Sequence, residues 1–176
     1  GSDSNTGLVD SAGGAFLTIQ KAVDTISNLD INAQTVVVQV KDGTYTGTTV
    51  LKNVLGYVSA GNLTIQGNNG TPANVVISTT SVECFKADGI SSVWDIKDMQ
   101  LKTTTAGNCL LVQNNSTLRL GNLDFNVCAA VHVACFYGSI IYALSNYTIS
   151  GGGTRHWSAS FNSFIFAASL TITISG

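Results

Sequence analysis

The chain has 176 residues, of which 44% are hydrophobic and only 10% are charged, and its formal net charge is −2. The length suits one domain with a substantial core, and the high hydrophobic content excludes a disordered chain. The near-neutral charge gives no electrostatic reason to expect nucleic acid as a partner. No apolar run reaches the roughly 18–20 residues that cross a bilayer, so we expect no membrane insertion, and no signal peptide is visible.

The N-terminal part predicts an irregular lead-in followed by a helix. Residues 1–15 are small and polar, and Gly1-Ser2 resembles the remnant of a cleaved tag. Residues 18–27 carry apolar side chains at the spacing i, i+3, i+4 and i+7, which is one face of a helix. Thr18 is the expected N-cap and Asn28 the expected stop. The apolar stripe consists of Ile19, Ala22, Val23 and Ile26.

After this helix, every hydrophobic pattern has a period of two, which is typical of strands. Residues 35–40, 62–67 and 75–78 predict strands, and residues 41–45 predict a turn. From residue 84 onward the chain repeats every 23 to 25 residues, and the copies begin at Cys84, Cys109, His132 and His156. Each copy contains three short strands separated by polar bends, the bends lying at Gly89, Asn114-Asn115, Gly138 and Asn162.

Three strands repeated at about 24 residues predict a parallel β-helix, because one such turn can bury its apolar residues only by stacking on its neighbours. We expect a single β-helix domain over residues 16–176, with rungs from residue 35 onward and the helix as an N-terminal cap. A sandwich or barrel is the alternative. The expected inward pairs of the last copy are Trp157/Ala159, Ile165/Ala167 and Leu170/Ile172.

Three N-terminal segments resemble the opening of pectin-lyase-like right-handed β-helix proteins. They read AFLTIQKAVDTI, VVVQVKDGTYTG and LTIQGNNGTPANVVIS. These sequences are most similar to those of phage and prophage tail fibres and tailspikes. The resemblance implies host-surface recognition, a homotrimer, and a place on the virion tail or another extracellular surface. It also implies polysaccharide as the ligand, because the enzymes of the superfamily act on polysaccharides as lyases, hydrolases or esterases.

Cysteines and carboxylates give no pattern typical of a metal site, so we expect neither metal nor cofactor. The four cysteines form no C-x-x-C pair and predict buried free thiols, with a Cys84–Cys109 bridge as the alternative. Asp88, Asp95 and Asp98 lack the compact spacing of a calcium loop.

Six polar residues are the weak candidates for catalysis. His132 and His156 occupy equivalent positions one rung apart, and Arg155 precedes the second; a histidine base beside an arginine would suit a lyase. The alternative is two neutral, partly exposed histidines at the starts of strands. Asp95 and Arg119 share an outward column and predict a surface ion pair. Asp124 lies in LDFNV, which only partly matches the D-F-I-F-G motif of pectin methylesterases, and its expected column continues through Thr148 and Thr171.

Aromatic residues gather in the last two copies and provide the candidate carbohydrate-binding residues. These are Tyr137, Tyr142 and Trp157, with Phe161 nearby, and Trp157 is expected to face the interior. Sugar rings stack on exposed aromatic faces, although such residues also fill interfaces. We therefore predict a non-catalytic module that binds cell-surface polysaccharide, with a polysaccharide-degrading enzyme and a structural trimeric shaft as alternatives.

Overall fold

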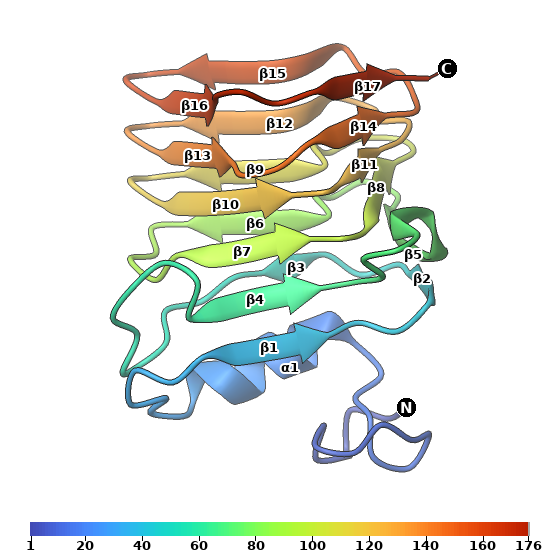
Figure 1. The fold of residues 1–176 in the computed structure, drawn as a ribbon, viewed down its shortest axis with the longest axis vertical. Helices are drawn as coiled ribbons and strands as arrows, with labels where there is room; N and C mark the ends of the chain where they lie inside the picture. The colour runs from blue at the N-terminus through green and yellow to red at the C-terminus, as the bar shows by residue number, and fades with distance from the viewer. Residues whose placement is uncertain (176) are drawn as a thin grey trace.

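The computed structural model describes residues 1–175 and shows a parallel β-helix (Figure 1), which confirms the predicted fold class. Strands of successive turns stack into three sheets, and every strand pair in them is parallel. The first sheet contains β1 (Val36–Gln39), β4 (Leu63–Gln66), β7 (Trp94–Lys97), β10 (Thr117–Gly121), β13 (Ile140–Ala143) and β16 (Phe164–Ala167).

The other two sheets complete each turn. The second sheet contains β2 (Gly43–Tyr45), β5 (Val75–Thr79), β8 (Gln100–Thr103), β11 (Asp124–Phe125), β14 (Tyr147–Ile149) and β17 (Ile172–Ile174). The third contains β3 (Thr49–Val50), β6 (Phe85–Asp88), β9 (Leu110–Gln113), β12 (Val131–Phe136) and β15 (Arg155–Ser160). A short 3₁₀ helix, η1 (Pro72–Asn74), precedes β5.

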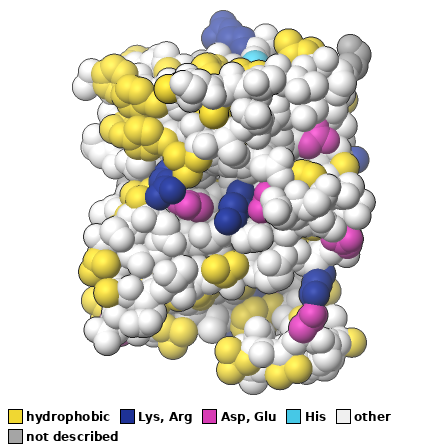
Figure 2. Space-filling model, in the orientation of Figure 1, with side chains coloured by type: hydrophobic (Ala, Val, Ile, Leu, Met, Phe, Trp, Pro, Cys, Tyr) yellow, Lys and Arg dark blue, Asp and Glu magenta, His cyan; other side chains and the backbone are white. Residues whose placement is uncertain are grey.

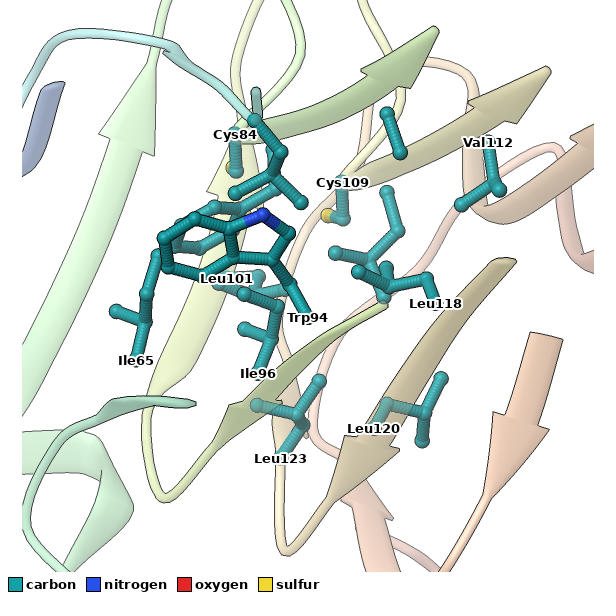
Figure 3. Packing of buried hydrophobic residues seen from close by; sticks show 14 of the residues in the cluster. Ile65, Cys84, Trp94, Ile96, Leu101, Cys109, Val112, Leu118, Leu120 and Leu123 are labelled. Atoms are coloured by element: carbon teal, nitrogen blue, oxygen red, sulfur yellow. The ribbon is translucent and has the colours of Figure 1, made fainter. Parts of the chain in front are cut away.

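Apolar side chains from all three sheets meet along the axis of the stack and form one continuous core. Trp94 is fully buried, and its indole Nε1 donates to the carbonyl of Lys52 at 2.9 Å. Ile96 follows it on the same strand, and in the next turn of the first sheet Leu118 pairs with Trp94 and Leu120 with Ile96 (Figure 3). Because inward and outward residues alternate along each strand, the core also fixes which side chains reach the surface.

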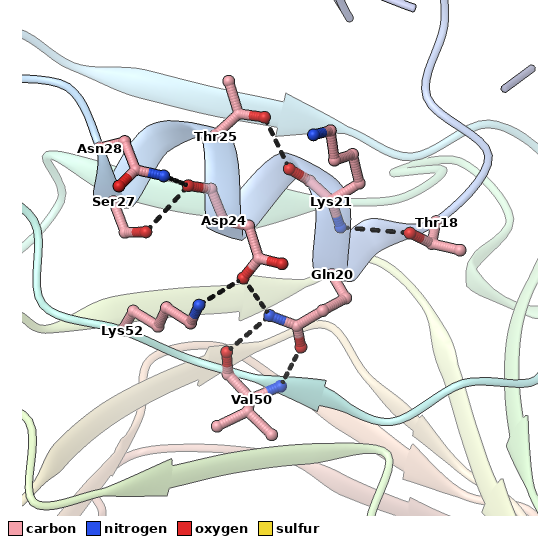
Figure 4. A network of polar contacts seen from close by, with 9 residues as sticks. All are labelled: Thr18, Gln20, Lys21, Asp24, Thr25, Ser27, Asn28, Val50 and Lys52. Atoms are coloured by element: carbon pink, nitrogen blue, oxygen red, sulfur yellow. Dashed lines mark hydrogen bonds and ion pairs between the residues drawn. The ribbon is translucent and has the colours of Figure 1, made fainter. Parts of the chain in front are cut away.

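Helix α1 (Ile19–Ser27) covers the N-terminal end of this core. The predicted range of 18–27 is right to within one residue, and both predicted ends are confirmed: the Thr18 hydroxyl, at the N-cap, accepts from the Lys21 N–H at 3.2 Å, and Asn28 is the C-cap. Gln20 joins the helix to the edge of the third sheet (Figure 4). Its side-chain oxygen accepts from the Val50 N–H at 2.6 Å, and its Nε2 donates to the Val50 carbonyl at 3.2 Å. The Gln20 amide thus replaces the neighbouring strand that β3 lacks on this side.

Two strand predictions need correction. Residues 41–45 were expected to form a turn, but Gly43–Tyr45 is strand β2 and pairs with β5. In the last copy, Ile172 rather than Leu170 pairs with Tyr147, so Thr173 and not Thr171 continues the Asp124–Thr148 column. A slip of two residues keeps the same face inward, which is why hydrophobic periodicity alone did not detect it.

Three further findings bear on the predictions. The registers with β12 and β13 place Trp157/Ala159 and Ile165/Ala167 in the inward columns as predicted, although Ala159 is exposed in this last turn. All four cysteines are free and buried, so the alternative Cys84–Cys109 bridge is not formed. Within residues 1–175, no helix has both the length and the apolar character that crossing a membrane requires.

Candidate functional site: a charged groove beside stacked aromatic rings

The outward face of the first sheet carries one column of side chains whose chemistry changes along the stack. The strand registers place Thr64, Asp95, Arg119, Tyr142 and Phe166 at the same position in successive turns. Neighbouring members are therefore about 4.8 Å apart at the backbone. Charged residues thus lie directly beside exposed aromatic ones. In Figure 2, charged side chains cross the middle of this face, and hydrophobic side chains gather above them at the upper left.

A groove of about 830 Å³ opens at the charged part of this column. Its lining includes Asp95, Lys97, Arg119 and Asn122, together with backbone and side chains of the segments that leave β10, β13 and β16. Gly121 is paired with Lys97 in the register, and its missing side chain contributes to the hollow, since an added Cβ would lie 3.0 Å from the Ser145 hydroxyl. This size lies within the range of small-molecule sites, about 300–1,000 Å³.

Asp95 and Arg119 form the predicted ion pair, but the pair is imperfect. Arg119 Nε lies 3.3 Å from Asp95 Oδ1, and the side chains are only 23% and 13% exposed respectively. Neither of these two buried atoms has a hydrogen-bond partner within the described part of the chain. Burial raises the pKa of the Asp95 carboxyl above its usual value, while the charges of Arg119 and Lys97 act in the opposite direction. The groove thus contains a desolvated carboxylate and a guanidinium with unused hydrogen-bonding capacity.

A second carboxylate of the groove is engaged by a neighbouring amide. Asp98 is buried, and its Oδ1 accepts from Asn122 Nδ2 at 2.7 Å. Asn122 is held by its backbone N–H, which donates to the Ser145 hydroxyl at 2.8 Å. Lys97 makes no hydrogen bond or ion pair with any side chain among residues 1–175. The groove therefore contains two acidic side chains, Asp95 and Asp98, and two basic ones, Lys97 and Arg119, so the formal charges of its lining sum to zero.

Aromatic rings form an exposed platform next to the groove. Tyr142 and Phe166 are stacked with ring centroids 5.2 Å apart and an interplanar angle of 14°. Phe164 extends the stack, 5.9 Å from Phe166 at 21°. Tyr142 is 38% exposed and Phe166 48% exposed, so the platform keeps substantial surface in solvent. Offset stacking of this kind leaves flat apolar area available to a ligand.

A second exposed aromatic pair occupies the bend between the third and first sheets. Tyr137 and Phe161 stack with centroids 4.8 Å apart at 13°. Both residues have positive φ, 56° and 54°, which is uncommon for a bulky side chain. Trp157, by contrast, faces the interior as predicted and packs against the core, so it does not join either exposed pair.

The two histidines do not reach the groove. The expectation that both are partly exposed is wrong for His132, which is 2% exposed and contacts the ring of Phe125 at a centroid distance of 5.6 Å. His132 Nδ1 lies 3.2 Å from His156 Nδ1, and His156 Nε2 lies 2.8 Å from the Tyr147 hydroxyl. His132 Nε2 lies 2.8 Å from the Asn126 carbonyl.

These distances determine where the hydrogens lie when both rings are neutral. A carbonyl only accepts, so His132 Nε2 donates to Asn126 and His132 Nδ1 accepts. His156 Nδ1 must then donate to His132, which leaves His156 Nε2 to accept from the Tyr147 hydroxyl. We call this series the Tyr147–Asn126 chain. Burial, with a smaller effect from His132, lowers the pKa of His156 to about 4, and burial raises the pKa of Tyr147 to about 12.

The six candidate catalytic residues therefore lie in three separate places. Asp95 and Arg119 line the groove, and His132 and His156 belong to the buried chain, with the exposed Arg155 next to His156. Asp124 lies on β11 of the second sheet, where its Oδ2 accepts from Gln100 Nε2 at 2.6 Å. Throughout residues 1–175, no three His, Cys, Asp or Glu side chains come together as a metal site would require.

Several groove residues were not singled out from the sequence. Lys97, Asn122 and Ser145 carry no motif, and only their place at or just after the ends of successive strands of one sheet could have linked them. Phe166 was recognisable as a member of the Asp95 column, but not as the stacking partner of Tyr142. In comparisons with known proteins, no family model, no curated protein and no solved structure matches this chain. The site must therefore be interpreted from its own geometry.

Proposed function

We propose that this chain is a host-surface recognition module of the phage-tail type, which binds cell-surface polysaccharide on the outer face of the first sheet without cleaving it. The observation that carries the proposal is the exposed Tyr142–Phe166 stack one turn away from the Asp95–Arg119 pair. An aromatic face packs against the C–H face of a sugar ring, and adjacent polar groups bind its hydroxyls.

Binding is favoured over catalysis by the positions of the candidate residues. Cleavage by paired carboxylates requires two groups roughly 5–9.5 Å apart on either side of the bond. Asp95 and Asp124 lie on different sheets, and Asp98 in the groove is buried and bonded to Asn122. The histidines are engaged in the Tyr147–Asn126 chain, away from the groove. A homotrimer remains part of the proposal and is tested by measuring the mass in solution.

The experiment measures binding of the chain to an array of bacterial cell-surface glycans. We expect Tyr142→Ala to lower the affinity for any bound glycan by about fivefold to hundredfold, since loss of one stacked ring removes roughly 1–3 kcal/mol of contact. Val37→Ala is the matched control, because Val37 is an exposed apolar residue further along the outward face of the same sheet, paired with Thr64. Binding that Tyr142→Ala leaves unchanged, or the absence of any bound glycan, would contradict the proposal.

A further inference from the structure

We propose that the groove recognises an uncharged sugar, and that a hydroxyl group of this sugar bridges Asp95 and Arg119. This inference rests on the proposed function, because it concerns the ligand of the same surface. It goes further by specifying the charge of the ligand and the two side chains that recognise it. Three features of the groove support it: the unmet hydrogen-bonding capacity of the pair, the charge balance of the lining, and the position of the aromatic platform.

The first feature is the imperfect ion pair. Asp95 Oδ1 and Arg119 Nε are both buried and lie 3.3 Å apart, yet neither has a hydrogen-bond partner among the described residues. Unsatisfied buried polar atoms are costly, and a native structure that keeps them needs a reason. A hydroxyl is suited to this pair because it donates one hydrogen bond and accepts others. Because Oδ1 and Nε are themselves shielded from solvent, the hydroxyl would donate to the other Asp95 oxygen, Oδ2, and accept from a terminal NH₂ group of Arg119 at the same time.

The second feature is the balance of charge. A carboxylate-bearing sugar would gain from Arg119 and Lys97, but it would be repelled by Asp95 and by the nearby Asp98. An amino sugar with a free ammonium group would face the opposite problem. Desolvation in a partly buried groove makes each like-charge contact expensive. The remaining polar groups, such as Asn122, Ser145 and Asn146, are amides and hydroxyls, which suit neutral hydroxyl groups.

The third feature is the register of the platform. Tyr142 is paired with Arg119, and Arg119 with Asp95, so the stacked rings and the ion pair lie on consecutive turns of one sheet. A sugar ring resting on Tyr142 would therefore present its edge hydroxyls toward Arg119 and Asp95. The ring contributes apolar area and the pair contributes orientation, which is the usual division of roles in a small-molecule site.

The test uses an array that carries neutral hexose and N-acetylhexosamine oligosaccharides beside uronic-acid and sialic-acid oligosaccharides. We expect the bound glycans to be neutral, and their binding to change less than twofold between low and high NaCl, because screening has little effect on an uncharged ligand. Asp95→Asn should weaken binding by about tenfold to hundredfold, the range for a lost charge-assisted hydrogen bond. Asp30→Asn is the matched control, since Asp30 is an exposed Asp far from the groove in the loop after α1.

The outcomes separate the two proposals. If acidic glycans bind and NaCl weakens them, while Tyr142→Ala abolishes binding, the proposed function stands and the uncharged ligand is wrong. If neutral glycans bind equally to the wild type and to Asp95→Asn, the bridging hydroxyl is wrong. If no glycan of either class binds, the proposed function fails and the inference fails with it. Thermal unfolding of each variant checks that a loss of binding is not a loss of fold.

Discussion

At the scale of single residues, one position in the bend between the third and first sheets adopts left-handed backbone in four successive turns. Hydrogen bonds across the bend make Gly89, Asn114, Tyr137 and Phe161 equivalent, and their φ angles are 65°, 59°, 56° and 54°. Glycine and asparagine tolerate this conformation, whereas a bulky residue pays roughly 1–2 kcal/mol. The last two turns keep aromatic side chains there despite that cost, which places a second exposed ring pair at the bend.

Tyr137→Asn should therefore raise stability. It introduces the residue that the same bend uses at Asn114, and it relieves left-handed strain of roughly 1–2 kcal/mol. The lost stack with Phe161 is exposed and falls at the low end of aromatic pairs, about 0.5 kcal/mol. We expect the free energy of unfolding in urea to increase by about 0.5–1 kcal/mol. A decrease would show that the stacked pair stabilises the bend more than the strain destabilises it.

Residue-scale prediction from the sequence failed for the histidines for a definable reason. Alternation assigns odd positions to one face of a strand and even positions to the other, but where β6, β9 and β12 begin, two consecutive residues are buried. Cys84-Phe85, Cys109-Leu110 and His132-Val133 all show this. A bend turns the chain so that both neighbours face the interior, and periodicity has no means of detecting it.

At the scale of elements, helix α1 acts as a cover attached through specific contacts. Beyond its apolar stripe, it is held by Gln20 on Val50 and by the ion pair between Asp24 and Lys52 at 2.7 Å. The sequence predicted the helix within one residue, because its spacing of 3.6 contrasts with the period of two that follows. It could not predict that Gln20 bonds to the backbone of β3, since that contact depends on how the helix lies on the stack.

Gln20→Ala should lower the free energy of unfolding by about 1–2 kcal/mol. The substitution removes two hydrogen bonds to the Val50 backbone, each of which contributes roughly 0.5–1.5 kcal/mol. Urea unfolding followed by circular dichroism measures the change. Gln34→Ala is the control, because Gln34 is an exposed glutamine in the loop between α1 and β1. Equal effects of the two substitutions would contradict a specific role for Gln20.

At the scale of the whole molecule, the buried histidine chain is one pH-dependent element of the fold. The folded state holds the pKa of His156 at about 4, below the ordinary value of about 6.5. The unfolded chain therefore binds a proton more readily between these two values. The contribution of His156 to stability is fully present above pH 6.5 and is lost progressively as the pH falls toward 4.

We expect the urea midpoint of the wild type to fall between pH 7 and pH 4.5. In His156→Gln, the midpoint should start lower at pH 7, because the Tyr147–Asn126 chain is interrupted, and should fall less over the same interval. The other groups with shifted pKa values, among them Asp95, whose pKa is raised by burial, and Cys128, whose pKa is lowered to about 5 by hydrogen bonding to Cys109, remain in both proteins. The difference between the two profiles therefore reports His156. Parallel pH profiles for the two proteins would contradict the assignment to His156.

The fold was more predictable than the site. The repeat of about 24 residues predicted the three sheets and the inward pairs of the first sheet, because stacking requires an apolar residue at the equivalent inward position of each turn. It also placed Asp95 beside Arg119. The groove could not be predicted, since β7 and β10 form only part of it and the segments after β10, β13 and β16 form the rest. Strand periodicity does not describe these segments, and the last of them leads to β17, whose register departs from the expected one by two residues.

The Gln20 cover has a consequence for self-assembly. Addition of strands from one molecule to the next can form a fibre only if each molecule offers an acceptor edge at both ends of its stack. At the β3 edge the backbone of Val50 is already bonded to Gln20, and helix α1 lies across the core. At the N-terminal edge of the third sheet, a strand from another molecule would have to displace Gln20 from Val50, so the cover disfavours strand addition at this edge.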